Sequence, residues 1–331
     1  MSEPLLSVRD LCVDYITPDG AVRALERISL DVAKGEVVGV AGESGCGKST
    51  FGQALLRILP APAVITGGEV IFEGRNLLKL SEAELRAVRW TRLSMVFQSA
   101  MDALNPVLTV GEQLADTLEA HGAGRGGKAR AAELLELVGI APDRARSYPH
   151  QLSGGMRQRV GIAIALALKP SLVILDEPTT ALDVIVEREI LQKILQLKQE
   201  FGFSVLFITH DLSRMLQISD RVAIFYAGKL IELGPAQELR QNPRHPYTKG
   251  LLRAFPSVHG GMVALSSIPG TPPSLRSPPP GCRFEPRCTV AIDRCRVAPG
   301  PELLQLGPRH AAACFVAQAE QQAPLQPAAT D

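Results

Sequence analysis

The sequence predicts an α/β protein whose core is a mainly parallel sheet with helices on both faces. Short apolar runs, "EVVGVAG", "LSMVFQ", "LVILDE" and "SVLFITH", are typical of buried strands. Between and after them, "MRQRVGIAIALAL" and "VIVEREILQKILQLKQE" are typical of helices. The second helix carries Val186, Ile190, Ile194 and Leu197 on one stripe. Strands alternating with helices predict a sheet that is buried on both sides.

The ends of the chain depart from this pattern. The β-rich start, including "LLSVRDLCVDYI", predicts an antiparallel β-subdomain, and Val110 to Gly139 is mostly helical. We expect a main domain at residues 1–240, with a helical subdomain at about residues 99–165. Proline-rich sequence with little periodicity then predicts a small loop-rich unit at 241–316, with a core separate from the main domain. A disordered tail is expected at 317–331.

Composition limits the possible partners and the location. The chain has 331 residues, and its 35 basic and 34 acidic residues leave a net charge of +1. This balance gives no bulk reason to expect nucleic acid or an anionic membrane as partner. The start "MSEPLLSVRDL" does not resemble a signal peptide, and the longest apolar run, "VGIAIALALK", is about half of a bilayer crossing. We therefore expect a cytosolic protein with reduced thiols.

A phosphate-binding loop follows the first buried strand. "GESGCGKS" fits the pattern G-x-x-x-x-G-K-[ST] at every position. Its glycines let backbone amides converge on phosphate oxygens at a helix start, where Lys48 reaches the β- and γ-phosphates and Ser49 binds Mg²⁺. A rival stretch, "GRGGKAR" from Gly124, lacks the hydroxyl residue and a preceding strand. The residues expected to bind nucleotide here are Gly42, Glu43, Ser44, Gly45, Cys46, Gly47, Lys48, Ser49 and Thr50.

Two adjacent acidic residues and a second helix N-terminus add further groups that are suited to binding and hydrolysing a nucleotide. Neighbouring side chains of a strand point in opposite directions, so Asp176 and Glu177 at the end of "LVILDE" can serve different tasks. We expect Asp176 to hold Mg²⁺ through water and Glu177 to polarise the attacking water. In "LSGGMRQR", Ser153, Gly154 and Gly155 open a helix whose free amides favour an anion. Two such helix starts cannot easily serve one phosphate group from the same side.

Together these motifs resemble a known family. "GESGCGKS", "VFQ", "LSGGM", "LVILDEPTTALD" and "FITHD", in this order, resemble the ATP-binding cassette of ABC transporters. The resemblance implies an ABC-type P-loop ATPase that uses ATP and Mg²⁺ and dimerises head-to-tail. It further implies that Tyr15 stacks on adenine, that Gln98 contacts Mg²⁺ and the attacking water, and that His210 holds the γ-phosphate. As alternatives, Tyr15 is an ordinary sheet aromatic and His210 an ordinary histidine at a strand end.

The resemblance also implies roles at a dimer interface. Ser153 and Gly155 would complete the partner's nucleotide site, and Asp183 would line the interface between the two cassettes. Cys46 occupies a variable position of the phosphate loop, and Cys12 is expected to be a small buried apolar residue.

Further stretches narrow the branch of the family. "ALNPVLTVGEQL", "YPHQLSGGMRQRV", "NPRHPYTKGLL" and "GCRFEPRC" resemble the ATPase subunits of oligopeptide and dipeptide importers, a branch that includes nickel and some oligosaccharide importers. "LSSIPGTPPSL" favours the D-type over the F-type subunit. The implied partners are two transmembrane permease subunits, a second cassette (F-type or identical) and an extracytoplasmic solute-binding protein. The implied location is the cytoplasmic face of the bacterial inner membrane.

Four of the six cysteines gather near the C-terminus. Cys282, Cys288, Cys295 and Cys314 have the spacing C-x5-C-x6-C-x18-C, which lacks the paired C-x2-C of zinc ribbons. Four thiols in a small, loop-rich unit of a reducing compartment still suggest a metal that stabilises it. The family resemblance favours a [4Fe–4S] cluster. Zinc, and free or disulfide-bonded cysteines, are the alternatives.

Two other classes of cassette protein fit less well. Soluble cassette ATPases of DNA repair usually carry large insertions and a basic surface, and those of translation carry two cassettes in one chain. Neither feature occurs in this sequence. A degenerate partner that binds ATP without hydrolysing it is disfavoured because Glu177 and His210 are both present.

Overall fold

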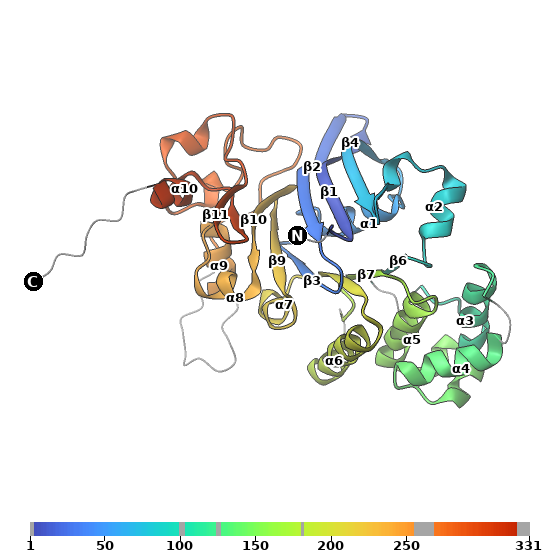
Figure 1. Ribbon diagram of the computed structural model, residues 1–331. Helices are drawn as coiled ribbons and strands as arrows, with labels where there is room; N and C mark the ends of the chain where they lie inside the picture. The colour runs from blue at the N-terminus through green and yellow to red at the C-terminus, as the bar shows by residue number, and fades with distance from the viewer. Residues whose placement is uncertain (1–2, 99–102, 124–126, 180–181, 255–267, 323–331) are drawn as a thin grey trace, which may run out of the picture.

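The computed structural model describes residues 3–98, 103–123, 127–179, 182–254 and 268–322. Two sheets form its centre, and helices surround them (Figure 1). The predicted α/β class, with a mainly parallel core, an antiparallel β region and a helical region, is confirmed. Part of the expected surface loop around Gly124 lies outside the described residues, as does the start of the region expected to form the helical subdomain.

The smaller sheet is antiparallel, with the strand order β2-β1-β4-β5. Its strands are β1 (Leu6–Thr17), β2 (Gly20–Val32), β4 (Ala63–Phe72) and β5 (Arg75–Asn76). The inward side chains of β1 and β2 share one core cluster with Phe51 and Leu55 of helix α1 (Lys48–Leu56). This packing fixes the sheet beside the helix that follows the phosphate loop, and it brings Tyr15, near the end of β1, to that loop.

The larger sheet has the order β11-β12-β10-β9-β3-β8-β7-β6, in which β10 is Lys229–Pro235, β11 is Leu304–Gly307 and β12 is His310–Ala312. Strands β9 (Arg221–Tyr226), β3 (Val37–Ala41), β8 (Ser204–Ile208), β7 (Leu172–Asp176) and β6 (Leu93–Val96) run parallel. Every residue of β3, β7 and β8 is buried, which explains why these strands are continuous apolar runs. Because parallel strands end at the same edge, the residues after β3, β6, β7 and β8 lie close together.

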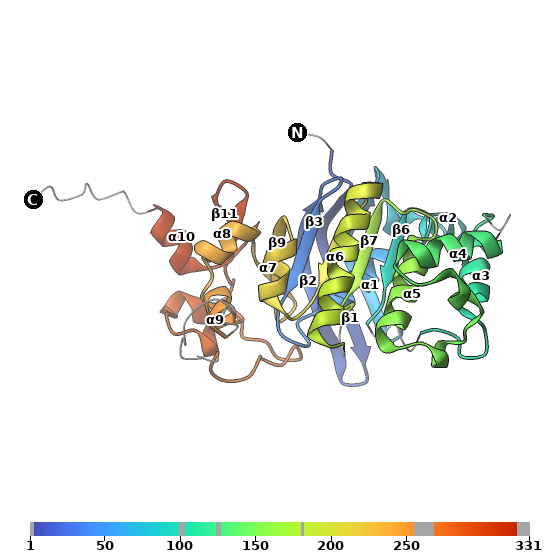
Figure 2. The same cartoon turned by 90° about the horizontal axis from the view of Figure 1, so that it is seen from below.

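Helices join and cover the strands. Their bounds are α1 Lys48–Leu56, α2 Glu82–Val88, α3 Val110–Glu119, α4 Gly127–Leu137, α5 Gly154–Leu166, α6 Val184–Phe201, α7 Leu212–Ile218, α8 Ala236–Gln241, α9 Pro246–Ala254 and α10 Phe315–Gln322. A capping box of Ser81 and Glu84 begins α2, and α6 ends at Gly202, whose backbone is left-handed with φ of 71°. Helices α3, α4 and α5 lie at one end of the molecule (Figures 1 and 2).

The C-terminal part of the chain lies at the opposite end and extends the larger sheet (Figure 1). β10 (Lys229–Pro235) pairs with β12 (His310–Ala312), which pairs with β11 (Leu304–Gly307). Strands of three or four residues are too short to show the alternation that sequence reasoning needs. Phe284 belongs to the core of the parallel sheet, and Cys282 and Cys288 pack against it. The cysteine unit therefore shares part of its packing with the main domain, while Leu306, Ala312, Cys314 and Ala317 form a small buried cluster of their own.

The last described helix corrects a second expectation. The sequence predicts that residues 317–322 belong to a disordered tail, but they form most of α10, and Ala317 is buried. The alanine and glutamine composition of this stretch favours a helix, and burial of its apolar side stabilises it. Residues 323–331 lie outside the described residues.

Candidate nucleotide site

The phosphate loop connects the end of β3 to the first turn of α1, as predicted. Two of its glycines are required by their surroundings. A Cβ on Gly42 would lie 2.2 Å from the Phe225 carbonyl oxygen, and one on Gly47 would lie 2.7 Å from Leu25 Cδ2. Both glycines also have positive φ, 151° and 103°, a region that side chains disfavour. The loop therefore leaves its backbone amides open to an anion at the start of α1.

Lys48 is folded back over the loop. Its Nζ donates to the carbonyl oxygens of Gly42 at 2.7 Å and Glu43 at 3.0 Å. The residue is almost fully buried, which is rare for lysine unless its charge is satisfied. The loop thus carries a positive charge at its centre, where a phosphate would be bound.

Ser49 and Asp176 form a pair of oxygen ligands suited to Mg²⁺. The Ser49 hydroxyl donates to Asp176 Oδ1 at 3.0 Å, from the first turn of α1 to the end of β7. Asp176 is only 2 % exposed. Burial raises the pKa of Asp176 and the charge of Glu177 adds to this, while the Ser49 hydrogen bond and Lys48 oppose it. A buried carboxylate beside a hydroxyl fits a hard divalent cation, which prefers oxygen ligands.

Glu177, Gln98 and His210 meet beside this pair. Gln98 Nε2 lies 3.4 Å from Glu177 Oε2, and His210 Nδ1 lies 3.4 Å from Glu177 Oε1. Glu177 has a φ of 45°, and its amide donates to the carbonyl oxygen of Ile208, the last residue of β8. The backbone thus turns at Glu177 and places the Glu177 carboxylate between the Gln98 side-chain amide and the His210 imidazole. The predicted catalytic residues Lys48, Gln98, Glu177 and His210 all lie in this area.

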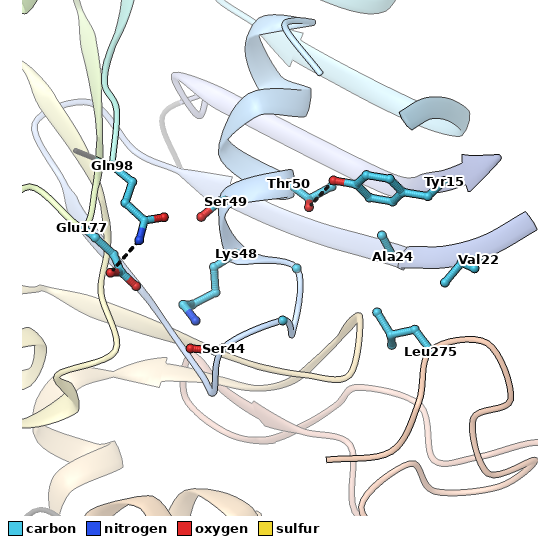
Figure 3. A pocket seen from close by; sticks show the side chains of 12 residues that line it. Tyr15, Val22, Ala24, Ser44, Lys48, Ser49, Thr50, Gln98, Glu177 and Leu275 are labelled. Carbon is cyan, nitrogen blue, oxygen red and sulfur yellow. Dashed lines mark hydrogen bonds between the residues drawn. The ribbon is translucent and has the colours of Figure 1, made fainter. Parts of the chain in front are cut away.

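A cavity of about 450 Å³ adjoins these groups, but Asp176 and His210 are not among the residues that line it (Figure 3). Ser44, Gly45, Gly47, Lys48, Ser49, Gln98 and Glu177 line its polar part. Tyr15, Thr50, Val22, Ala24 and Leu275 line the rest. Tyr15 Oη lies 3.3 Å from Thr50 Oγ1, which fixes the phenol ring at the edge of the cavity. The cavity thus combines a cationic, amide-rich end with an apolar end.

Two predicted nucleotide-binding residues have other side-chain contacts. The Glu43 carboxylate is paired with Arg287 at 2.6 Å, and Cys46 is buried in the core, where burial raises the pKa of its thiol. Neither is among the residues that line the cavity. Only their backbone groups remain to contact a phosphate.

Sequence reasoning missed three residues of the cavity wall, Val22, Ala24 and Leu275. Val22 and Ala24 lie on β2, next to the strand that carries Tyr15. Leu275 comes from the proline-rich segment 268–280, and its neighbour Arg276 pairs with Asp19 at 2.9 Å. Nothing in a stretch such as "PPSLRSPPP" marks Leu275 as a cavity residue.

The second helix start borders a different cavity, of about 410 Å³. Ser153 and Gly155 line it, together with Arg159 and Glu189, and Ser153 caps α5 by accepting from the Met156 amide at 3.3 Å. Asp183 caps α6, where Oδ1 accepts from the Ile185 and Val186 amides. Within one chain, Ser153, Gly154, Gly155 and Asp183 are therefore not brought into the cavity beside Lys48.

The four C-terminal cysteines lie near one another. Burial raises the pKa of the Cys282 thiol to about 11, and the neighbouring thiols Cys295, Cys314 and Cys288 add to this. All four are free thiols. In the part of the chain that the structure describes, however, no group of three or more histidine, cysteine or acidic residues has the geometry of a metal site. His310, four residues before Cys314, has a different partner, because its Nε2 lies 2.8 Å from the buried Glu232 carboxylate.

The fold and the site define the class: a nucleoside-triphosphatase with a phosphate loop after β3 and two adjacent acids, Asp176 and Glu177, at the end of β7. Among the described residues, no helix combines the length and the apolar character that a membrane crossing requires.

Comparisons with known proteins agree with this class. The family model described as "ABC transporter" matches residues 25–180, and that described as "Oligopeptide/dipeptide transporter, C-terminal region" matches residues 231–295. A probable peptide ABC transporter ATP-binding protein of Sinorhizobium fredii is 47 % identical over 94 % of both chains. The dipeptide transport ATP-binding protein DppD of Bacillus subtilis is 45 % identical over 90 % of this chain and 91 % of its own. The oligopeptide transport ATP-binding protein OppD of the same organism is 45 % identical over 87 % and 82 %.

A solved structure adds a comparison in three dimensions. A dimeric ATP-binding cassette in a post-hydrolysis state, bound to ADP and Pi, superposes with a TM-score of 0.63 at 29 % identity. It covers 70 % of this chain and 98 % of its own. The protein therefore belongs to the family of ABC transporter ATP-binding proteins with the oligopeptide/dipeptide C-terminal region, and it is an ATPase. The family comparisons are consistent with the D-type and do not favour the repair or translation alternatives.

Proposed function

We propose that this ATPase drives the uptake of peptides through two transmembrane permease subunits, at the cytoplasmic face of the bacterial inner membrane. The observation that carries the proposal is the likeness, at 45–47 % identity, to proteins named for peptide, dipeptide and oligopeptide transport. The match to the C-terminal region of that branch supports it further. A solute-binding protein outside the membrane would supply the solute, and a second cassette, F-type or identical, would complete the ATPase pair.

Transport by the reconstituted complex tests this proposal. The full-length protein is purified with its co-eluting membrane subunits, identified by mass spectrometry, and placed in liposomes with the solute-binding protein. We expect ATP-dependent uptake of di- and oligopeptides. Uptake of nickel or an oligosaccharide in place of peptides would contradict the proposed solute.

Within the site, we propose one role for each predicted side chain. Tyr15 receives the adenine at the apolar end of the cavity, and Lys48 receives the β- and γ-phosphates at the other end. Mg²⁺ would be held by Ser49, by Gln98 and, through water, by Asp176, and it would neutralise phosphate charge there. Glu177 orients the attacking water, and His210 contacts the γ-phosphate. The 3.4 Å contacts that Glu177 makes with Gln98 and His210 support their joint action.

We propose further that each nucleotide site is completed by a second cassette. Ser153, Gly154 and Gly155 would face the γ-phosphate bound by the partner, and Asp183 would lie at the interface. This is supported by the separate cavity that Ser153 and Gly155 line, away from the Lys48 site of the same chain. The dimeric state of the similar solved cassette supports it as well.

We also propose that Cys282, Cys288, Cys295 and Cys314 hold a [4Fe–4S] cluster in a C-terminal domain spanning residues 241–316. A set of four thiols suits iron–sulfur clusters and zinc, and two of the cysteines are neighbours, since the Cys282 amide donates to the Cys295 carbonyl oxygen at 2.8 Å. The described residues have no ready metal geometry, so the cysteines would have to shift on binding. A bound cluster would stabilise this part of the chain.

Anaerobic purification tests the cluster. We expect a brown protein with broad absorption near about 400 nm and about four irons per chain. Cys288→Ser should bleach it, whereas Cys12→Ser, a substitution in β1, should not. A colourless preparation with stoichiometric zinc, or with thiols that react freely, would contradict the cluster.

A further inference from the structure

The segment from Cys282 to Cys288, "CRFEPRC", inserts three side chains into the ATPase core. Arg283, Phe284 and Arg287 are all buried, although the segment itself is an irregular loop with one short 3-10 turn. Phe284 packs edge-on against Tyr226 and Tyr247. We propose that this segment is a positioning element for the phosphate loop, and that Arg287 is the residue through which it acts.

Arg287 binds the side chain of Glu43, the second residue of the phosphate loop. Nη1 and Nη2 donate to the two carboxylate oxygens of Glu43 at 2.6 and 3.0 Å, a bidentate pair. Nε donates to the Pro269 carbonyl oxygen at 2.8 Å, and Nη1 also lies 3.3 Å from Tyr226 Oη. The Arg287 side chain is only 4 % exposed. Each nitrogen of the guanidinium thus has a partner, which fixes its plane and with it the Glu43 side chain.

The backbone of Glu43 is held from the same part of the chain. Its amide donates to Tyr247 Oη on α9 at 3.0 Å, and its carbonyl oxygen accepts from Lys48 Nζ at 3.0 Å. Glu43 is therefore anchored through both side chain and backbone by residues more than 200 positions away. The carbonyl that orients the phosphate-binding lysine belongs to this anchored residue.

Arg283 supports the loop at a second point. Its Nη1 donates to the carbonyl oxygen of Ala227, and its Nη2 pairs with Glu26. Ala227 and Gly228 form the turn between β9 and β10, and the Gly228 amide donates to the Cys46 carbonyl oxygen at 3.0 Å. One segment thus contacts the phosphate loop directly at Glu43 and, through a turn, at Cys46.

The charges predict the direction of the effect. Glu43 places a carboxylate in the loop that must accept a highly anionic triphosphate, and Arg287 compensates it. Without Arg287, the carboxylate would be unpaired and free to move, and both changes oppose phosphate binding. We expect Arg287→Gln to weaken MgATP binding by about tenfold, within the range measured for coupled residues.

A double-mutant cycle on the full chain tests this. MgATP affinity is measured for the wild type, Arg287→Gln, Glu43→Gln and the double variant, well below the melting temperature of each. Arg296→Gln is the matched control. It is the same substitution nine positions on, at a side chain that is 64 % exposed and pairs with Glu285 and Asp293. Lys48→Ala removes the side chain that we propose to bind the phosphates, and it shows how far MgATP affinity falls when the nucleotide site is lost.

The proposal predicts a strong effect of Arg287→Gln, little effect of Arg296→Gln, and a double variant that binds no more weakly than Arg287→Gln alone. A merely structural role would lower the melting temperature without this non-additivity. Normal affinity in folded Arg287→Gln, equal losses in the two arginine variants, or strictly additive losses would each overturn the proposal. If Arg287→Gln does not fold, Arg287→Lys replaces it, because lysine keeps the charge but not the bidentate geometry. We then expect an intermediate affinity, and wild-type affinity would overturn the proposal.

Discussion

The phosphate loop and the cysteine segment are both dense in motif residues, but their chemistry is encoded differently. In Gly42–Ser49, the sequence alone defines backbone and ligands, because glycine is required where a Cβ would strike Phe225 or Leu25. In Cys282–Cys295, the cysteines attract attention, yet the hydrogen bonds that reach the phosphate loop and the turn beside it are made by Arg287 and Arg283. A local motif can be interpreted from its own residues, whereas the role of a docking segment depends on what it touches.

The largest expected effect is in the region that the sequence defines best. Glu177→Gln should keep MgATP binding but slow hydrolysis by roughly 10²-fold or more, since the amide cannot polarise the attacking water. Steady-state phosphate release with a binding titration separates the two quantities. Glu200→Gln, an exposed change on α6, is the control. Hydrolysis at the normal rate would show that the carboxylate has another role.

A second effect depends on a partner chain. Ser153→Arg should leave nucleotide affinity of the isolated protein unchanged and lower hydrolysis in the assembled transporter by roughly tenfold or more, because a bulky cation would face the partner's γ-phosphate. Gln151→Arg, exposed and two residues away, should do neither. Equal loss of binding by the isolated chain would mean that Ser153 serves its own site.

A smaller expected effect, on nucleotide affinity, distinguishes the apolar end of the cavity from the phosphate end. Leu275→Ala should weaken MgATP binding by about fivefold, as expected for losing part of a buried leucine contact, and should leave inorganic tripolyphosphate binding unchanged. The contrast arises because Leu275 borders the apolar end, near Tyr15 and Val22. Leu304→Ala, an exposed leucine of the C-terminal part, is the control. Equal weakening of both ligands would place Leu275 at the phosphate end instead.

The smallest effect concerns stability. Because burial raises the pKa of Asp176, the folded state binds the Asp176 proton more tightly than the unfolded state does. The free energy of unfolding therefore falls as the pH rises from the pKa of Asp176 in the unfolded chain through its raised pKa in the folded chain. At neutral pH, Asp176→Asn should therefore raise the melting temperature without nucleotide by about 1–2 °C, while hydrolysis is lost. Calorimetry and phosphate release give the two readings. A lower melting temperature would mean that the charged carboxylate stabilises the empty site.

The sequence was sufficient to predict the parallel core, because the core strands are continuous apolar runs. It was also sufficient to predict the phosphate loop and the positions of Asp176 and Glu177, because the spacing of these motif residues reflects their chemistry. It was not sufficient for Leu275, Arg287 or Tyr247, whose partners lie on distant parts of the chain. It also failed for β11 and β12, which are too short for a periodic signal, and for residues 317–322 of α10. Long-range contacts and short elements are properties of the packed molecule, and no local pattern reports them.

Hydrogen exchange at the phosphate loop tests the link between the two regions most directly. Exchange of backbone amides in a peptide covering residues 42–49 is followed by mass spectrometry, without nucleotide, in the wild type, Arg287→Gln and Arg296→Gln. If the cysteine segment holds the loop, exchange will be clearly faster in Arg287→Gln and unchanged in Arg296→Gln. The same exchange in all three proteins would show that the loop is fixed by its own sequence alone and that the contact with Arg287 is incidental.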